Sequence, residues 1–309
     1  MKAVTTPKYG PPEVMKVVEM DKPVPAGDEV LINVCASSVS TGDCRARSFN
    51  VPLHVWLPAR IALGIFRPRA PVQGLWITGV VEEAGEKAAL FKPGDRICAN
   101  TISAGMRFGG YAEYASLPEK SLMTRMPDGL SFEEAVSIPF GALSALYFLR
   151  KGNIGMGKRL LVHGASGAVG SAAVQLAAYY GARVDGVCSS VNVELVRSLG
   201  ADRVFDYTRE DFARNGGKYD IVFDAAGKAI RSECNRALAP GGMFVSVISS
   251  GHVDMRLEDL DFVFDLAGTG RIRPVMDRSY PLERLAEAHA YVELGHKKGN
   301  VTVTNGVCG

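Results

Sequence analysis

The chain has 309 residues, of which 47% are hydrophobic and 22% are charged, and its formal net charge is +2 at pH 7. This composition is typical of a soluble globular protein with room for two domains of ordinary size, and it excludes a disordered chain. The near-neutral charge argues against nucleic-acid binding, and the start, MKAVTTPKYG, lacks the hydrophobic region of a secretory signal. The six cysteines show no CxxC pair and no disulfide-like spacing, so we expect reduced thiols and a cytoplasmic protein.

The first 120 residues indicate a β-rich domain. Short apolar runs at 30–36, 77–82, 96–99 and 112–117 are separated by Gly and Pro at short intervals, which is typical of a compact barrel-like domain of short strands. Ser131, followed three residues later by Glu134, predicts a capping box. The helix that it opens is expected to break near Pro139 and to end near Lys151.

The most apolar stretch, Val51 to Phe66, is interrupted by Pro52, His54 and Pro58 and is too short to span a bilayer. Two interpretations of it remain open: contact with a membrane surface, or an apolar pocket, which we favour. A lid over a hydrophobic substrate, formed together with the basic residues up to Arg69, is a third interpretation.

From Lys158 the pattern changes to an alternation of strands and helices. Candidate strands lie at 159–164, 183–188, 203–206, 219–224 and 242–248, with helices between them. This alternation predicts a doubly wound parallel sheet. A helix at about 257–267 and a final strand at 300–304 follow, without an internal repeat or a low-complexity linker.

Residues 160–170, LLVHGASGAVG, predict a nucleotide-binding turn. An apolar run ends in Gly164, and Gly167, Gly170, an apolar helical pattern and a second apolar run follow it. This is the strand, glycine turn, helix and strand of a dinucleotide-binding unit. A side chain at Gly167 would keep the backbone from a pyrophosphate held by the N–H groups of the helix start, and one at Gly170 would push the helix off the strand. The alternative is that these glycines serve packing alone.

The end of the second strand indicates which dinucleotide binds. An NAD site places a carboxylate there to hold a ribose hydroxyl, whereas this chain has Cys188 followed by Ser189 and Ser190. A carboxylate at about 4 Å from a 2′-phosphate costs about 4 kcal/mol per charge pair at an effective dielectric constant of about 20, so its absence favours NADPH. The alternative is a solvated loop at 189–192 with no phosphate contact, since this loop contains no Arg or Lys.

Several separate motifs, in order along the chain, carry a resemblance to a known family. They are MKAV and YGPPEV near the start, FKPGDRI at 91–97, GGYAEY at 109–114, LSFEEAVSIPFGALSALYFL at 130–149, GASGAVGSAAVQLA at 164–177, CSSVNVELVRSLGADRVFDYT at 188–208 and YDIVFDAAG at 219–227. Through them the chain resembles a zinc-independent medium-chain dehydrogenase/reductase (MDR) of the quinone oxidoreductase type. The resemblance implies an α/β fold. A GroES-like β-barrel substrate domain, residues 1–122 and 271–309, would be joined to a Rossmann NADP-binding domain with a doubly wound parallel sheet, residues 123–270.

The resemblance also implies which residues bind the cofactor. The pyrophosphate would be cradled by Gly164, Ser166, Gly167, Ala168, Val169 and Gly170. The adenosine 2′-phosphate would be surrounded by Ser189, Ser190 and Tyr207, while Val191 stands where relatives carry a basic residue. The nicotinamide and its ribose would be bounded by Ser144, Ala225, Ala226, Val247, Ile248 and Asn300.

The resemblance further argues against a metal. The two motifs that hold catalytic zinc in related alcohol dehydrogenases are replaced by residues 40–43, Ser-Thr-Gly-Asp, and 74–76, Gly-Leu-Trp, which offer no Cys or His ligand. The five histidines, at positions 54, 163, 252, 289 and 296, lie in different segments without ligand spacing. We therefore expect no bound metal.

Without a Lewis acid, reduction of a polarised acceptor needs less help than oxidation of an alcohol. The resemblance places Ser40 and Asp43 to orient substrate or pass a proton; a purely structural Asp43, and proton delivery from water, are the alternatives. Trp76 would lie with Ser144 in the substrate pocket, where its indole either stacks on a flat acceptor or, as we favour, fills the space of the lost metal.

The leading hypothesis is therefore an NADPH-dependent, metal-independent reductase of a small hydrophobic quinone or α,β-unsaturated carbonyl. One alternative is a reductase of carrier-bound enoyl thioesters, which a basic patch of Arg45, Arg47, Arg60, Arg67 and Arg69 would suit. Another is a non-catalytic NADP-binding sensor or structural protein. Relatives have a further helix and a sixth strand after the fifth strand, so we expect the sheet to lack its sixth strand and the chain to be a monomer or a non-standard dimer.

Overall fold

The computed structural model describes residues 1–51, 56–103, 105–251 and 253–306, and it divides into two compact units. Unit 1 consists of Met1–Ser137 with Met276–Gly309, and unit 2 of Ile138–Val275. The sequence placed the boundaries earlier, after residues 122 and 270. The first difference has a physical cause: helix α3 (Phe132–Val136) packs on strands of unit 1, and the Thr78 hydroxyl donates a hydrogen bond to the Phe132 carbonyl at 2.8 Å.

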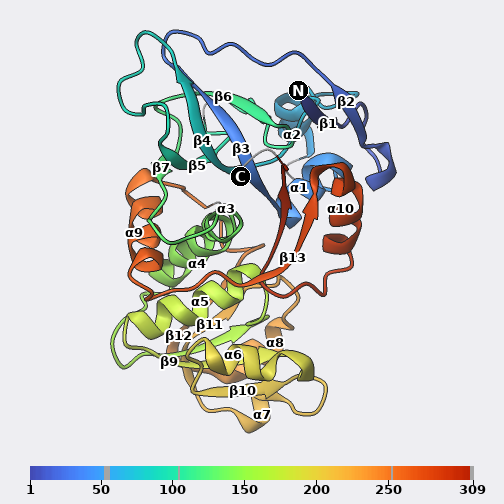
Figure 1. The fold of residues 1–309 in the computed structure, drawn as a ribbon. Helices are drawn as coiled ribbons and strands as arrows, with labels where there is room; N and C mark the ends of the chain where they lie inside the picture. Colours follow the sequence, from blue (N-terminus) through green and yellow to red (C-terminus); the bar gives the residue numbers. More distant parts are fainter. Residues whose placement is uncertain (52–55, 104, 252, 307–309) are drawn as a thin grey trace. The chain divides into compact units, whose positions relative to one another are not determined.

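Unit 1 is built on one long strand. The strands of this unit are β1 (Lys2–Thr5), β2 (Lys16–Glu19), β3 (Glu29–Val39), β4 (Trp76–Ala84), β5 (Arg96–Asn100), β6 (Tyr114–Pro118), β7 (Met123–Arg125), β13 (Met276–Pro281) and β14 (Asn300–Thr304). They form a seven-stranded sheet in the order β13-β14-β3-β4-β5-β7, with β6 also paired to β3, and the separate pair β1-β2 (Figure 1). Because β3 pairs with β4 along one side and with β6 and then β14 along the other, it organises the β-rich domain that the sequence predicted.

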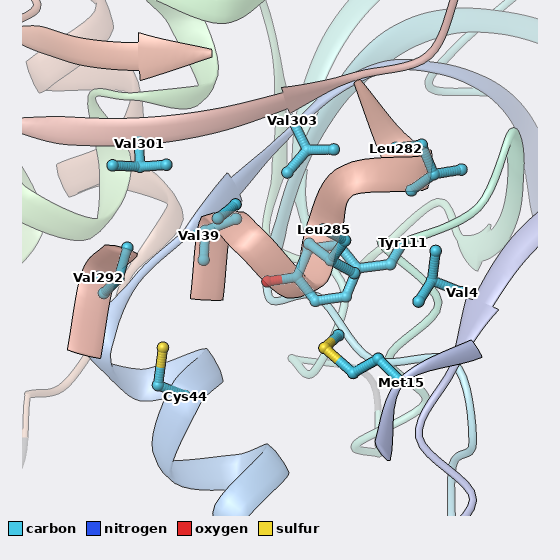
Figure 2. Close-up of a cluster of buried hydrophobic side chains, with 11 residues drawn as sticks. Val4, Met15, Val39, Cys44, Tyr111, Leu282, Leu285, Val292, Val301 and Val303 are labelled. Atoms are coloured by element: carbon cyan, nitrogen blue, oxygen red, sulfur yellow. The ribbon is translucent and has the colours of Figure 1, made fainter. Parts of the chain in front are cut away.

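The closing segment of the chain completes the core of unit 1. Besides α3, the helices of this unit are α1 (Thr41–Ser48), α2 (Trp56–Leu63) and α10 (Leu285–Glu293). Figure 2 shows Leu285 and Val292 of α10 and Val301 and Val303 of β14 in one buried cluster with side chains from the first 111 residues, Tyr111 among them. Each buried aliphatic side chain of this kind contributes about 1.5–3 kcal/mol, which holds the returning segment in unit 1.

Unit 2 is the predicted doubly wound domain. Its strands are β8 (Arg159–His163), β9 (Arg183–Cys188), β10 (Arg203–Asp206), β11 (Tyr219–Asp224) and β12 (Leu238–Ser246), all parallel, in the order β10-β9-β8-β11-β12. Its helices are α4 (Pro139–Lys151), α5 (Ala168–Tyr179), α6 (Val193–Ser198), α7 (Phe212–Asn215), α8 (Arg231–Ala237) and α9 (Leu257–Gly268). Figure 1 shows these strands and helices. Leu161, Val187 and Val222 of the sheet pack with Phe212 of α7 and Cys234 of α8 in one core cluster.

The parallel sheet has five strands in the part of the chain that the structure describes, as predicted. Within the described residues β12 pairs only with β11, and α9 is the next element along the chain. Strand β12 also begins at Leu238, before the predicted 242, with a register shift near Tyr219. The expectation of a monomer or a non-standard dimer, which rests on this edge, stays a prediction.

The local helix signals were read correctly. Ser131 and Glu134 form the predicted capping box at the start of α3, and the following helix begins at Pro139. Among the described residues one helical stretch, Phe132–Lys151, has the length and apolar character of a membrane span, and 72% of its apolar window is buried inside the protein. Burial to this extent is typical of a core helix.

The cysteines depart from the sequence expectation at one position. Cys44, Cys98, Cys188 and Cys234 are free and buried. The expectation that all six thiols are reduced is wrong at Cys35, which is disulfide-bonded. Cys308 lies outside the described residues.

Candidate functional site

The glycine turn after β8 has the geometry of a dinucleotide cradle. Gly164 adopts φ +80°, and a Cβ there would lie 2.7 Å from the Ala226 Cβ, so only glycine fits. A Cβ at Gly170 would lie 2.1 Å from the Gly164 carbonyl oxygen, whereas one at Gly167 would meet that oxygen only at an ordinary 3.5 Å. Gly170 is thus required by helix packing, and Gly167 is not required by any protein neighbour within the described residues. Its missing side chain leaves room for a ligand.

Helix α5 begins at this turn and leaves donors for an anion. Its N-cap, Gly167, has no side chain to cap the first N–H groups, which belong to Ala168, Val169 and Gly170. The positive end of the helix dipole points in the same direction. Sequence reasoning missed Gly141 of α4, which allows α4 to pack closely against the start of α5. A Cβ at Gly141 would lie 2.4 Å from the Ala168 carbonyl oxygen. The signal for it was a glycine within the α4 helical pattern.

Ser144 lies one turn after Gly141 in α4. Its hydroxyl donates to the Phe140 carbonyl at 2.8 Å, and its side chain is buried. The proton of the hydroxyl is therefore used within the helix, and the oxygen keeps a lone pair with which it accepts a hydrogen bond.

Asn192, which sequence reasoning did not single out, links the glycine turn to the loop after β9. Its Nδ2 donates to the Ser166 Oγ at 3.1 Å and to the Ser189 Oγ at 3.2 Å. Its Oδ1 is buried and has no hydrogen-bond partner among the described residues. A buried, unsatisfied amide oxygen costs about 1–3 kcal/mol, so this atom indicates that a donor group is missing from the site. No local sequence pattern reveals such an atom, because it depends on three separate segments.

The loop after β9 contacts a carboxylate of the neighbouring strand that the sequence argument did not foresee. Asp206, the last residue of β10, is the register partner of Cys188. It accepts hydrogen bonds from the Ser190 hydroxyl and from Thr208, and Arg209 Nε lies 3.5 Å from the same Oδ2 that Ser190 contacts. The Ser190 hydroxyl, followed by Thr208 and Arg209, holds the pKa of Asp206 below its usual range.

The neighbouring strand thus places a carboxylate, Asp206, beside Cys188, and the Arg209 guanidinium lies 3.5 Å from it. Tyr207 lies beside both, since its N–H donates to the Cys188 carbonyl at 3.1 Å, and its side chain is exposed.

The ends of β11 and β12 are joined by a buried carboxylate. Asp224 Oδ1 accepts from the N–H groups of Ala226, Gly227 and Lys228, and Oδ2 accepts from the Ser246 hydroxyl at 3.2 Å. Burial acts to raise the pKa of Asp224, but the His163 imidazole, 3.6 Å away, and the N–H groups of the turn outweigh it and hold the pKa low.

Asp224 therefore fixes the backbone of two predicted cofactor segments at once. Ala225 donates its N–H to the His163 carbonyl, and Val247 donates to the Asp224 carbonyl. A Cβ at Gly227 would lie 2.3 Å from the Ile248 Cδ1, so this side chain lies directly against the turn. The structure thus brings the unit 2 candidates together along the carboxyl ends of the strands, where open parallel sheets bind their ligands.

The remaining candidates belong to unit 1. Asn300 is the first residue of β14 and is buried, and Trp76 is the first residue of β4 and is fully buried. An indole enclosed in this way has no free face at the protein surface. This burial supports the interpretation of Trp76 as a space-filling residue.

Ser40 and Asp43 form the capping box at the start of α1. The Ser40 hydroxyl donates to Asp43 Oδ2 at 2.5 Å and accepts from the N–H groups of Gly42 and Asp43. Asp43 Oδ1 accepts from the Leu75 N–H at 3.0 Å. Both side chains are buried, and burial raises the pKa of Asp43 to about 6. Ser40 Oγ and Asp43 Oδ2 are thus used within the capping box, and Asp43 Oδ1 joins α1 to the residue before β4.

A pH-dependent contribution to stability follows from Asp43. An unfolded Asp has a pKa near 4, so between about pH 4 and pH 6 the folded chain holds a proton that the unfolded chain has released. Folding stability is expected to fall as pH rises through this window, by about 3 kcal/mol for a shift of about 2 units. Urea unfolding of the wild type and of Asp43→Asn at a series of pH values measures it as a difference, because other carboxylates titrate nearby. Parallel pH profiles of the two proteins would contradict the assignment.

The prediction of an exposed basic patch is wrong for one of its five arginines, Arg47. Its guanidinium is fully buried: it donates to the Gly10 carbonyl, forms an ion pair with Glu293, and donates through Nε to His289 Nδ1 at 3.3 Å. His289 Nε2 lies 3.3 Å from the Tyr111 hydroxyl. Burial, reinforced by the Arg47 charge, lowers the pKa of His289 to about 3, so this imidazole is neutral.

Metal ligation finds no support in the described residues, where no group of three or more His, Cys, Asp or Glu side chains is placed to hold an ion. His54 and His252 lie outside the described residues, as do residues 52–55 of the predicted lid. His163 and His289 contact Asp224 and Arg47 in separate units.

Comparison with known proteins gives a consistent result across the chain. Residues 25–128 match the model of an alcohol dehydrogenase GroES-like domain, and residues 168–272 match that of a zinc-binding dehydrogenase. The chain is 33% identical to the chloroplastic NADPH-dependent alkenal/one oxidoreductase of Arabidopsis thaliana, over 98% of this chain and 79% of that protein. It is 30% identical to a human quinone oxidoreductase, over 94% and 93% of the two chains. The structure of the quinone oxidoreductase from Coxiella burnetii superposes with a TM-score of 0.86 at 25% identity, over 98% and 99% of the two chains.

Proposed function

The chain belongs to the medium-chain dehydrogenase/reductase superfamily, as a quinone oxidoreductase-like member, and on this premise we propose that it reduces quinones or α,β-unsaturated carbonyls with NADPH. The observation that carries the proposal is the cradle at the end of β8: Gly167 has space where a Cβ would stand, and Asn192 Oδ1 lacks a partner. A Rossmann domain with these features fits a dinucleotide.

The residues present fit such a cofactor. The N–H groups of residues 168–170 would bind the pyrophosphate, and Asn192 Oδ1 would accept a hydrogen bond from a ribose hydroxyl. Asp224 holds the turn at Ala225 and Ala226, whose small side chains leave the carboxyl edge of β11 accessible to a flat ring. The bound dinucleotide supplies a hydride to the acceptor. On this proposal the chain binds and orients it, and the fixed backbone dipoles at the strand ends require no reorganisation during the reaction.

NADPH is proposed over NADH, with Arg209 as the residue that permits it. Asp206 alone would repel a 2′-phosphate, but the Arg209 guanidinium offsets its charge, and the Ser190 and Thr208 hydroxyls donate hydrogen bonds to its two oxygens. Ser190 and Arg209 contact the same carboxylate oxygen, so a 2′-phosphate that replaces this oxygen as the acceptor of the Ser190 hydroxyl proton would lie within reach of the guanidinium. The name of the Arabidopsis relative, an NADPH-dependent enzyme, supports the same choice.

Arg209→Gln is expected to weaken NADPH binding by up to about fivefold and to leave NADH binding unchanged, because an exposed ion pair is worth at most about 1 kcal/mol. Fluorescence titration with each nucleotide measures both constants. Arg214→Gln is the matched control, since Arg214 forms the same type of exposed pair with Asp211 at 3.4 Å. Equal loss of NADH affinity in Arg209→Gln would contradict the assignment of the 2′-phosphate subsite.

On the acceptor side we propose that no metal takes part and that the proton comes from water. Ser40 and Asp43 would act as positioning residues: their polar atoms hold α1 against Leu75, and the Ser40 proton is already donated to Asp43. The acceptor classes proposed, quinones and enones, are already polarised, so their reduction does not require a Lewis acid.

The first test measures nucleotide binding and then turnover with soluble quinones and enones on the purified protein. Micromolar NADPH binding with acceptor-dependent NADPH oxidation is the expected result. Binding without turnover by any acceptor would favour a sensor or structural protein, and turnover restricted to carrier-bound enoyl thioesters would favour an enoyl-thioester reductase.

The basic patch that would suit an acidic carrier has fewer exposed arginines than the sequence predicted, since Arg47 is buried and Arg60 is enclosed by aromatic rings. We also propose a cytoplasmic location.

A further inference from the structure

The outer surface of α2 and of the turn after it is apolar and cationic. Five large apolar side chains within eleven residues have between 43% and 91% of their area exposed, and α2 has no buried residue. Two exposed arginines end the segment. We call this surface the α2 patch; it consists of Trp56, Leu57, Ile61, Ile65, Phe66, Arg67 and Arg69. A cluster of this kind on a protein surface indicates an interaction site.

The inner side of α2 is firmly held, so the exposure of the patch follows from the fold. The Arg60 guanidinium lies 3.8 Å from the ring centre of Phe49 and also contacts the rings of Tyr9 and Trp56. Its Nη1 donates to the Ile65 carbonyl at 2.7 Å, and the Tyr9 hydroxyl donates to the Gly64 carbonyl at 2.8 Å. These contacts fix the turn in which Ile65 and Phe66 point to solvent.

The turn itself requires glycine at Gly64. This residue adopts φ +122°, and a Cβ there would lie 2.1 Å from the Arg67 carbonyl oxygen. Arg69 returns to α2, where its Nη2 donates to the Ile61 carbonyl at 2.9 Å. The two arginines are therefore carried on the same fixed turn as the apolar side chains.

The charge of this part of the chain is uniformly positive. No Asp or Glu occurs between Asp43 and Glu82, a segment that contains five arginines. The Arg67 side chain makes no ion pair or hydrogen bond in the described part of the chain. An exposed apolar surface bordered by unpaired cations has the composition that binds to the interface of an anionic bilayer.

We propose that the α2 patch docks the protein on an anionic lipid bilayer. Phe66, Leu57, Ile61 and Ile65 would enter the boundary between headgroups and acyl chains, with Trp56 at headgroup level, while Arg67 and Arg69 contact lipid phosphates. A second copy of the chain fits this surface less well, because twofold pairing would bring arginines against arginines without a carboxylate in the segment. The docking does not depend on the proposed reductase activity.

Vesicle binding of the full chain tests the proposal without any turnover. Sedimentation with vesicles of phosphatidylcholine alone, and of phosphatidylcholine with phosphatidylglycerol, is expected to show binding to the anionic vesicles that weakens with added salt. The chain has two tryptophans, of which Trp76 is buried and Trp56 is exposed. Lipids brominated in the acyl chains are therefore expected to quench the Trp56 emission, and Trp56→Phe to remove that signal.

Two variants with matched controls locate the surface. Phe66→Ser is expected to weaken vesicle binding by about tenfold or more, and Arg67→Gln by about fivefold. Met156→Ser and Arg183→Gln remove an exposed apolar and an exposed cationic side chain of unit 2 and are expected to bind as the wild type does. The proposal is overturned if anionic vesicles are not bound, or if the two patch variants bind them unchanged. It is also overturned if light scattering shows a dimer that Phe66→Ser dissociates while no vesicle binds, because a second copy then occupies the patch.

Discussion

Gly170→Ala is expected to destabilise unit 2 by about 2 kcal/mol or more. The added Cβ would lie 2.1 Å from the Gly164 carbonyl oxygen and 2.8 Å from the Ala165 Cα, both of them backbone atoms. Backbone of this kind moves only if α5 shifts off β8, and overpacking typically costs about 1–3 kcal/mol. Alanine is the better helix former by about 1 kcal/mol, which offsets a part of the loss. The midpoint of urea unfolding, followed by far-UV circular dichroism, measures the effect.

Gly167→Ala makes the same chemical change three residues earlier and has the opposite expected profile. Its Cβ would meet only the Gly164 oxygen, at 3.5 Å, and its φ of −78° is open to alanine. The urea midpoint should therefore change little, while dinucleotide affinity should fall by about tenfold or more, because the methyl group occupies the position where the pyrophosphate approaches the backbone.

The pair of variants separates packing from binding. Fluorescence titration with NADPH is carried out on Gly167→Ala at a temperature at which circular dichroism shows it to be folded. Wild-type affinity in this variant would refute the cradle, and wild-type stability in Gly170→Ala would refute the packing argument. A loss of stability in both variants would support the interpretation that the glycines serve packing alone.

The parts of the fold that could be predicted from sequence are those fixed by local patterns. Strands β9, β10, β11 and β14 have the predicted ends, because each is a short segment with β-branched or aromatic residues between turn residues. The capping box at Ser131 depends on two side chains three residues apart. The glycine spacing at 164–170 is also a local pattern, since the three atoms nearest to a Cβ at Gly170 belong to residues 164 and 165.

The parts that could not be predicted depend on residues distant in sequence. Asp206 is next to Cys188 only because β10 pairs with β9 in one register, and that register brings Arg209 to the same carboxylate as Ser190. The sequence of the loop after β9 contains neither the Asp206 carboxylate nor the Arg209 guanidinium, so the loop alone does not predict them. Asn192 was missed for the same reason, since its importance lies in an unpaired oxygen between Ser166 and Ser189.

Arg47→Met is expected to lower the stability of unit 1 by about 3–5 kcal/mol. The variant keeps the length of the aliphatic chain, but it leaves the Gly10 carbonyl, the Glu293 carboxylate and His289 Nδ1 without their donor. Removing one partner from a buried charge network costs this much because the other polar groups stay desolvated. Glu293 is partly exposed and recovers some solvation, which favours the lower part of the range.

Arg45→Met provides a control on the same helix. Arg45 is exposed, two residues before Arg47, and the sequence assigned both arginines to one basic patch. The helix turns by about 100° per residue, so these side chains point to opposite sides of α1, and only that of Arg47 meets α10. Arg45→Met should change stability by about 0.5 kcal/mol or less. Equal urea midpoints for the two variants would mean that Arg47 is solvated and that its contacts with His289 and Glu293 do not form. A loss confined to Arg47→Met would show instead that this arginine anchors the returning α10 segment to the start of the chain.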